Sequence, residues 1–446
     1  MRLSLALPLV VILLALPVSA AERDPATLAA WDAYEAVTAE IDAERATSSG
    51  RLRAAKAAAD DLDAKARQLH TAYLAAQGFG DDEVDAAHDA WEAAKAAAED
   101  ARVKLEDDRR AWLAKMQEQR TRQGAALETL RAAFAASDWT AWSETDDAAL
   151  LEQGLGAVAR HATESDPKGA IRAWETLLAR LPACRSADPA RTTWLPILYP
   201  STGDLALALT KLRALHDAVD EKWKATMLVH LGDVRALAGD VEVARTRYQE
   251  AKQAAQSDAE LDRYDPRKRA ERDADLRLKL IGRTAPEIAS PTWFGGEAVP
   301  LSSLEGKVAV LDFWATWCQP CRSVMPKLDE LHRAIEARGG TVLGVTRFYA
   351  NGFLPHDAGD LHAGEPVRGM DEATYLGHLA TFKARTKIGY PFVVAAPQSF
   401  KDYEITGIPT VVVVGRDGKV AYVAVGGMRE ALIRMAVDRA LGDKSD

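Results

Sequence analysis

The sequence predicts a multidomain protein in which an all-α N-terminal half precedes an α/β domain. Three observations support this fold class. Residues 22–136 are rich in Ala and charged side chains, residues 138–256 carry an internal repeat, and residues 281–443 combine apolar, strand-like runs with helical spacing. At 446 residues the chain is long enough for several domains, each with its own core.

The first 20 residues (1–20) predict a secretory signal peptide. An apolar run follows Arg2, and the small residues 19–21 resemble a cleavage site. Pro8 and Pro17 interrupt the run, which is short for a membrane-spanning helix. We therefore expect an exported protein, periplasmic or otherwise extracytoplasmic. An uncleaved membrane anchor is the alternative.

Residues 22–136 predict an Ala-rich region of long helices, packed as a hairpin or coiled coil. Gly, Pro and β-branched residues are scarce there, which favours helix. Breaks at 48–50 and 78–82 would divide the region into about three helices. A partly disordered stalk is the alternative.

An internal repeat marks residues 138–256. The segment 202–208 (TGDLALA) recurs as 238–244 (AGDVEVA), and 166–170 stands at nearly the same interval upstream. A bulky residue follows the repeated alanine by four positions in each copy: Trp174, Leu212 and Tyr248. The pattern resembles two to three degenerate tetratricopeptide-like units, which usually bind a peptide or partner protein on a concave face. An ordinary helical bundle is the alternative.

Residues 257–280 are strongly charged and predict a linker, helical in part. Such a tether would keep the C-terminal domain near whatever the helical half binds and so raise its effective concentration. The net charge of −10 and pI near 5.5 leave little basic surface for nucleic acid, so no nucleic-acid partner is expected.

Two cysteines stand where a buried strand passes into a helix. Residues 308–315 are apolar nearly throughout, and residues 323–335 have helical spacing. Cys318 is therefore expected at a helix N-terminus, where free N–H groups and the helix dipole favour a thiolate. Cys321 follows one turn later. This arrangement favours thiol–disulfide exchange, in which Cys318 attacks and Cys321 resolves the mixed disulfide.

A zinc half-site is the alternative explanation of the cysteine pair. It would need two further ligands, and the third cysteine, Cys184, lies in a helical region far away along the chain. We expect Cys184 to be a free thiol; an intermolecular disulfide and an internal regulatory substrate of Cys318 are the alternatives. We expect no metal, and no cofactor other than a redox-active Cys318–Cys321 disulfide.

Several motifs follow one another within residues 281–443. They are GRTAP at 282–286, VPLSSLEGK at 299–307, LDFWATWCQPCR at 311–322, Pro326, and YEITGIPT at 403–410. Together they resemble a thioredoxin-like domain, and within that superfamily the TlpA/ResA-like extracytoplasmic thiol–disulfide oxidoreductases. The resemblance covers a little over a third of the chain.

The resemblance implies an enzyme that reduces disulfide-bearing client proteins through the Cys-Gln-Pro-Cys motif. Its electrons would come from a membrane donor that this chain does not encode. The alternative is a protein-binding scaffold in which the helical repeat region is the primary functional part. The presence of both cysteines together with Asp312 and Pro409 favours the enzyme.

The resemblance also implies roles for residues around the dithiol. Pro409 matches the cis-proline that faces the dithiol and leaves the backbone of Ile408 free to pair with a client. Trp317 would cover the disulfide and limit solvent access. Pro320, between the cysteines, completes the expected client-binding set.

Asp312 is an acid inside an apolar strand, and burial of a carboxylate is costly without a reason. It matches the buried acid of thioredoxins that exchanges a proton with the second thiol, and desolvation would raise its pKa toward the working range. TlpA/ResA-like relatives often carry Asn at this strand position and an acid where this chain has Val324. A carboxylate held by backbone N–H groups is the alternative.

Overall fold

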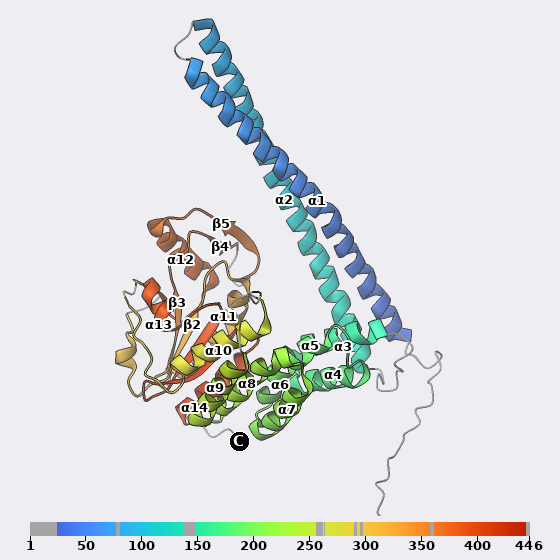
Figure 1. The fold of residues 1–446 in the computed structure, drawn as a ribbon, viewed down its shortest axis with the longest axis vertical. Coiled ribbons are helices and arrows are strands. Elements are labelled where there is room, and N and C mark those ends of the chain that lie inside the picture. The colour runs from blue at the N-terminus through green and yellow to red at the C-terminus, as the bar shows by residue number, and fades with distance from the viewer. Residues whose placement is uncertain are drawn as a thin grey trace, which may run out of the picture. The chain divides into compact units, whose positions relative to one another are not determined.

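The computed structural model describes residues 25–76, 81–136, 148–255, 262, 264–289, 292–294, 298–356 and 361–442. The predicted signal peptide (1–20) lies outside these residues. The chain divides into two compact units, Met1–Val158 and Ala159–Asp446. An all-helical N-terminal half is followed by a mixed α/β domain (Figure 1), which confirms the predicted fold class.

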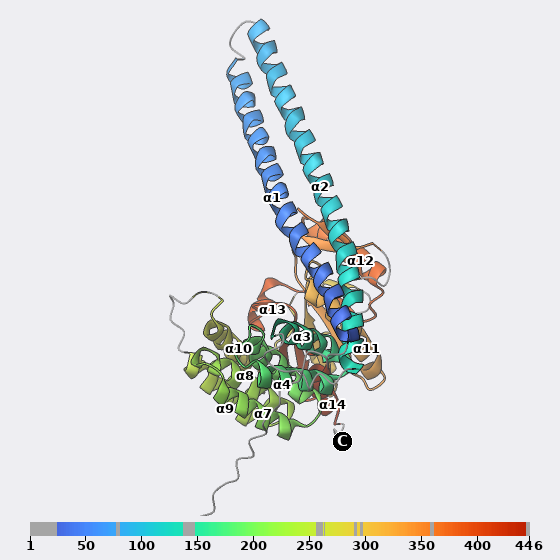
Figure 2. The same ribbon diagram turned by 90° about the vertical axis from the view of Figure 1, so that its right-hand side faces the viewer.

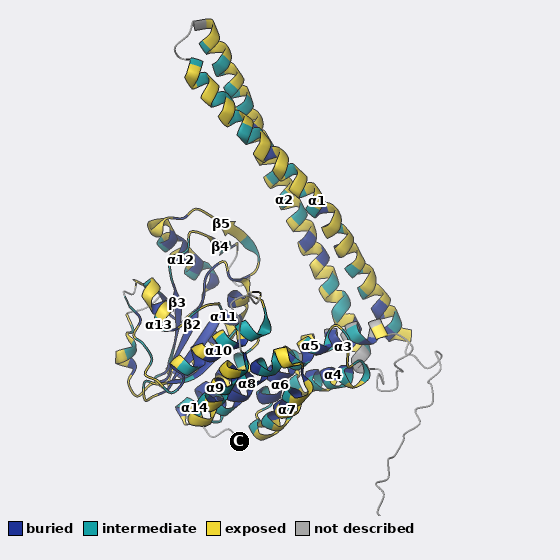
Figure 3. Cartoon of the chain, viewed as in Figure 1, coloured by how far each residue is buried: buried dark blue, intermediate teal, exposed yellow. Residues whose placement is uncertain are grey.

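The first unit contains two long helices, α1 (Pro25–Ala76) and α2 (Asp81–Ala136), which pack against each other. Ion pairs across the pair join Arg102 to Asp63 at 2.6 Å and Arg122 to Glu40 at 2.9 Å. As one residue number rises the other falls, so the helices run antiparallel as a hairpin. Most of their surface is exposed (Figure 3).

The break predicted at 48–50 is wrong, because these residues continue α1. A serine hydroxyl disfavours a helix when it hydrogen-bonds to nearby backbone groups in a non-helical conformation. Here Ser49 donates to the carbonyl of Arg45, one turn back, and Ser48 donates to the Glu44 carboxylate. Both hydroxyls are satisfied within the helix, so the region forms two helices where the sequence predicts about three.

The second unit begins with a succession of helices. They are α3 (Ala148–Ser165, shared with the first unit), α4 (Pro167–Arg180), α5 (Ala187–Pro189), a π-helical turn (Ala190–Trp194), α6 (Leu195–Ser201), α7 (Leu205–Ala218), α8 (Glu221–Leu237), α9 (Val241–Ala255) and α10 (Pro266–Leu280). Two aspartates of the repeat cap the helices that follow them, α4 and α7. Asp166 accepts a hydrogen bond from Gly169 N, and Asp204 accepts one from Leu207 N, each at 2.9 Å.

The repeated small and bulky positions are buried. Ala170 with Trp174, Ala208 with Leu212 and Ala244 with Tyr248 all lie at 0% exposure. A Cβ added at Gly232 on α8 would lie 2.3 Å from Tyr248 Cε1, so glycine lets α8 and α9 approach. The small and bulky residues therefore pack as the repeat pattern predicts. The tetratricopeptide-like assignment itself stays a prediction.

The segment predicted as a charged linker, helical in part, does contain a helix, but that helix is packed into the fold. Its second part forms α10, which packs against α8 and α9. Arg277 of α10 is 1% exposed and donates two hydrogen bonds to Asp233 of α8, at 2.5 and 2.9 Å. Tyr248 of α9 donates a third to the same carboxylate at 3.0 Å. A charge that composition assigns to solvent is thus buried in an ion pair between helices.

The α/β domain contains a six-stranded mixed sheet of order β1-β6-β3-β2-β7-β8. Its strands are β1 (Thr292–Phe294), β2 (Ala309–Phe313), β3 (Thr341–Thr346), β6 (Phe392–Val394), β7 (Thr410–Val414) and β8 (Val420–Val425). A 3₁₀ turn (Leu301–Leu304) precedes β2, and β4 (Gly352–Pro355) pairs with β5 (Gly364–Val367) as a separate hairpin. The accompanying helices are α11 (Gln319–Glu336), α12 (Glu372–Thr386), α13 (Pro397–Asp402) and α14 (Glu430–Leu441).

One hydrophobic core joins the sheet to the helices before it. The same buried cluster includes Tyr248 of α9, Leu280 of α10, Val423 of β8 and Ile433 of α14. Helix α14 contacts α6 and α8, and α8 contacts β8. Helices α8, α9 and α10 lie side by side in this part of the chain (Figure 2). Burial of shared apolar surface makes this part of the chain a single packed body. Within the described ranges, no helix is both long enough and apolar enough to cross a bilayer.

Candidate active site

Cys318 and Cys321 form a disulfide at the start of α11, with their Cα atoms 5.3 Å apart. Cys318 is the N-cap of this 18-residue helix, and its Sγ accepts a hydrogen bond from Cys321 N at 3.2 Å. Cys318 is 3% exposed and Cys321 is 0% exposed. The N-cap position brings a backbone N–H and the positive end of the helix dipole to the Cys318 sulfur, which favours a thiolate after reduction.

Asp312 lies one residue before the end of β2, the strand that leads to the dithiol, and is 1% exposed. Its Oδ2 accepts one hydrogen bond, from the Tyr390 hydroxyl at 3.3 Å, and its Oδ1 has no partner among the described residues. Burial raises the pKa of Asp312 to about 7, while the Tyr390 hydrogen bond acts in the opposite direction. A carboxylate held by backbone N–H groups is therefore the wrong alternative.

Tyr390 is a site residue that the sequence analysis does not identify. Its hydroxyl reaches Asp312 from the segment before β6, and its ring lies 6.2 Å from that of His332 on α11. Gly344 of β3 pairs with Asp312, and a Cβ there would lie 3.1 Å from the Tyr390 ring and 2.7 Å from Phe392. Glycine at 344 therefore leaves room for the tyrosine beside the acid. This arrangement depends on strand register, which no local motif reveals.

Pro409 follows a cis peptide bond from Ile408, the isomer that the family resemblance implies. Antiparallel pairing of β2 with β7 places Thr410 opposite Phe313. Pro409, one residue earlier, is therefore at the end of β2 from which the chain runs to Cys318. The carbonyl of Pro409 accepts a hydrogen bond from Gly426 N at 2.9 Å.

The remaining predicted client-binding residues surround the same end of the sheet. Trp317 is 45% exposed, and its ring packs edge-on against Tyr349, with centroids 5.6 Å apart. Pro320 lies in the first turn of α11, and Ile408 is partly buried against the core. Trp317 contacts the chain after β3 through Tyr349. Nearly half of its side chain stays exposed to solvent beside the dithiol.

Arg322, directly after Cys321, is a second residue that the sequence analysis leaves out. It is 4% exposed, and its guanidinium donates to the carbonyls of Thr316 and Leu361, each at 2.6 Å. It also lies 3.9 Å from the centre of the Phe353 ring on β4. Thr316 is tied to the same region through His378, whose Nε2 lies 3.0 Å from the threonine hydroxyl.

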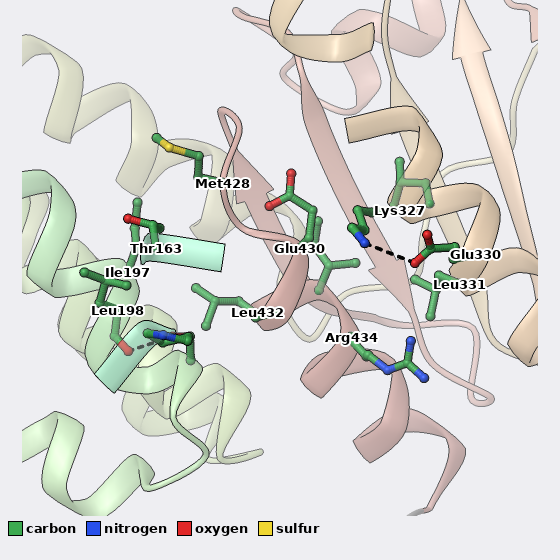
Figure 4. A pocket seen from close by; sticks show the side chains of 15 residues that line it. Thr163, Ile197, Leu198, Lys327, Glu330, Leu331, Met428, Glu430, Leu432 and Arg434 are labelled. Carbon is green, nitrogen blue, oxygen red and sulfur yellow. Dashed lines mark hydrogen bonds and ion pairs between the residues drawn. The ribbon is translucent and has the colours of Figure 1, made fainter. Parts of the chain in front are cut away.

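A cavity of about 270 Å³ lies away from this chemistry, between the helical layer and the α/β domain (Figure 4). Ile197 and Leu198 of α6, Leu331 of α11 and Leu432 of α14 supply apolar walls, and the Lys327–Glu330 ion pair lies at its edge.

In the part of the chain that the structure describes, no cluster of His, Cys, Asp and Glu side chains is arranged to hold a metal ion. Cys184 forms no disulfide.

Comparison with known proteins agrees with this geometry. The Redoxin family model matches residues 280–440. The thiol-disulfide oxidoreductase ResA of Geobacillus thermodenitrificans is 26% identical over 159 residues, which are 35% of this chain and 76% of the relative. ResA of Geobacillus kaustophilus is 27% identical over 149 residues, 33% and 71% of the two chains. The α/β domain is a TlpA/ResA-like thioredoxin-fold domain.

The chain is therefore an oxidoreductase of the thiol–disulfide class. A crystal structure of a putative thiol:disulfide interchange protein DsbE from Chlorobium tepidum is also similar. It is 24% identical and covers 36% of this chain and 98% of its own, with a TM-score of 0.28. The assignment rests on the family model and the sequence relatives. The Redoxin match lies within the α/β domain and does not extend over the helical half.

Proposed function

We propose that this protein is an extracytoplasmic disulfide reductase that acts on protein clients through Cys318 and Cys321. One observation carries the proposal: the Cys318 sulfur caps α11 and accepts the Cys321 N–H, on a strand–helix junction that also buries Asp312 without a cation. The predicted signal peptide supports export. A membrane donor not encoded by this chain would return electrons to the disulfide.

The exchange transfers two electrons from the dithiol to a client disulfide. The Cys318 thiolate attacks one client sulfur, the client S–S bond breaks, and the departing sulfur leaves as a thiolate that takes up a proton. Cys321 then loses its proton and attacks Cys318 Sγ. That step breaks the mixed disulfide, forms the Cys318–Cys321 disulfide and releases the second client sulfur.

Asp312 would accept the Cys321 proton. A base works best when its pKa lies near the operating pH, and burial places the pKa of Asp312 at about 7. Because no cation neutralises it, the carboxyl group can hold a proton while the disulfide is formed and lose it when turnover requires. Tyr390 would orient the group through its hydrogen bond to Oδ2.

Clients would bind at the end of the sheet that carries Ile408 and Pro409. An extended client segment can pair with the Ile408 backbone as an added strand does. The half-exposed Trp317 ring and Pro320 supply an apolar surface next to the sulfur atoms. The helical repeats would hold a protein ligand or client close to this surface, since they share a core with the domain.

The reduction potential of the Cys318–Cys321 pair tests the proposal. The mature protein is equilibrated in glutathione or dithiothreitol buffers, and the fraction of disulfide is measured by alkylation. We expect a value near thioredoxin's ~−270 mV, as a reductase requires. A value near ~−120 mV would make the protein an oxidant. A pair that does not cycle would leave the binding scaffold as the function. Cys321→Ser should trap client mixed disulfides that the matched variant Cys318→Ser does not.

A further inference from the structure

Arg322 is a buried cation, and its partners among the described residues are all neutral. Its two hydrogen bonds go to backbone carbonyls, and its face lies over the Phe353 ring. Among the described residues no carboxylate lies within ion-pair distance of its guanidinium. Burial lowers the pKa of Arg322 to about 10, a value at which the side chain still carries its charge at neutral pH. Its positive charge therefore has no counter-charge in the part of the domain that the structure describes.

An uncompensated buried charge is costly, so its position calls for an explanation. Arg277, which is buried to a similar degree, has a carboxylate partner in Asp233. Arg322 instead lies in the first turn of α11, one residue after Cys321, and its N–H bonds to the Cys318 carbonyl at 3.1 Å. Its guanidinium is bound to the carbonyl of Thr316, two residues before Cys318. The unpaired charge is thus held at the loop that carries the attacking sulfur.

The same guanidinium joins two parts of the domain. Thr316 belongs to the loop before the dithiol, whereas Phe353 and Leu361 belong to β4 and the chain leading to β5. Because the planar guanidinium donates in fixed directions, it sets the distance between these segments. A lysine could supply the charge but not both directed hydrogen bonds.

We propose that Arg322 is a positioning residue for disulfide exchange: it holds the dithiol loop against the β4–β5 hairpin and keeps a positive charge beside the Cys318 thiolate. The inference rests on the proposed role of Cys318 as attacking thiol. In a buried site a nearby cation stabilises an anion much more than it does in water. The charge therefore favours the reduced protein and the reactive thiolate. A purely structural arginine would affect stability and leave both of these quantities unchanged.

The test compares Arg322→Met with Arg322→Lys. Loss of the charge in Arg322→Met should shift the equilibrium with glutathione about tenfold toward the disulfide, which lowers the potential by about 30 mV for a two-electron couple. Alkylation of Cys318 below the pH of half-maximal reactivity should slow by a similar factor. Arg322→Lys should stay close to wild type in both measurements but lose hydrogen-exchange protection in β4. The matched control is Arg333→Gln, on the exposed face of the same helix, where Arg333 pairs with Asp329.

A second pair of variants avoids removing the arginine, in case Arg322→Met does not fold. Phe353→Glu would place a carboxylate over the guanidinium, and Phe353→Gln is its neutral counterpart. The glutamate variant should shift the glutathione equilibrium in the same direction as Arg322→Met, and the glutamine variant should shift it less than twofold. If every charge-altering variant that folds stays within twofold of wild type, the inference is overturned. If the Cys318–Cys321 pair of the wild-type protein does not cycle, the proposed function is overturned instead. The two failures are distinguishable, because failure of the proposed function is seen in the wild type and failure of the inference only in the variants.

Discussion

Two buried aspartates of the second unit have opposite surroundings. Asp233, where α8, α9 and α10 meet, is 4% exposed and accepts two hydrogen bonds from Arg277 and one from Tyr248. Asp312, on the strand before the dithiol, is 1% exposed and accepts one long hydrogen bond from Tyr390. The two carboxyl groups are buried to a similar extent, so the difference between them comes from their hydrogen-bond partners. A carboxylate with a cation is a structural element, and one without a cation can titrate near neutral pH.

The arginines show the same contrast. Arg277 neutralises Asp233 in the junction between the helices, whereas Arg322 near the dithiol has only carbonyls and an aromatic ring as partners. The helices α8, α9 and α10 therefore enclose a buried ion pair. The region around the dithiol contains a carboxyl group, Asp312, and a cation, Arg322, that are not paired with each other. Unpaired buried charges reduce stability, and such strain is concentrated at functional sites.

The largest effect should come from breaking the closed pair. Arg277→Met leaves the Asp233 carboxylate buried without its cation, which costs about 3–5 kcal/mol of unfolding free energy. Chemical denaturation of the full chain measures the loss. The double variant Arg277→Met/Asp233→Asn should regain part of it, because the buried charge is gone. A loss below about 1 kcal/mol for Arg277→Met would contradict this prediction, because the buried pair would then contribute no more than an exposed ion pair does.

The pH dependence of stability should separate the two aspartates next. The folded protein holds the Asp312 proton up to about pH 7, whereas the unfolded chain releases it near pH ~3.9. The contribution of Asp312 to the unfolding free energy should therefore fall as pH rises from about 4 to about 7, by about 4 kcal/mol in all, and then level off. The difference between wild type and Asp312→Asn measures this contribution, because His230, His332 and His378, whose pKa values burial lowers, act in the opposite direction in both proteins. Asp312→Asn should lack this decline and be the more stable protein at pH 8. Equal pH profiles would show that Asp312 is ionised in the fold.

Asp312→Asn should also slow turnover at neutral pH. A positioned base typically contributes about 10²–10⁴-fold, and the resolving step loses this base while the first attack by Cys318 does not. Stopped-flow measurement of mixed-disulfide formation and decay separates the two steps. Decay should slow and formation should stay within a few-fold of wild type. An unchanged decay rate would remove Asp312 from the proton transfer.

The smallest effect should follow loss of the Tyr390 hydroxyl. Its hydrogen bond lowers the pKa of Asp312, so Tyr390→Phe should raise that pKa further above about 7. A single hydrogen bond of this kind is worth about 1 kcal/mol, less than one tenfold step in acidity. The pH profile of mixed-disulfide decay should move upward by that amount. A downward movement would mean that Tyr390 stabilises the protonated acid instead.

The sequence by itself determined the features that depend on local order along the chain. Cys318 at a helix start and the burial of Asp312 follow from an apolar strand and a helix in direct succession, whereas the cis bond before Pro409 follows from the family resemblance. The helix-rich composition likewise predicts an all-α N-terminal half. Apart from the cis bond, these predictions succeed because each depends on neighbours within a few residues.

Only the tertiary structure decided which charges meet. Arg277 and Asp233 lie 44 residues apart, and Tyr390 and Asp312 lie 78 residues apart. Charged composition predicts a solvated linker over 257–280, yet packing of α10 against α8 and α9 buries one of its arginines beside an acid. A side chain's electrostatic role depends on what surrounds it in space, and strand register and helix packing set those surroundings. Aspartate and arginine therefore form a structural ion pair between the helices. Near the dithiol the same two residue types are not paired with each other, and the aspartate titrates near neutral pH.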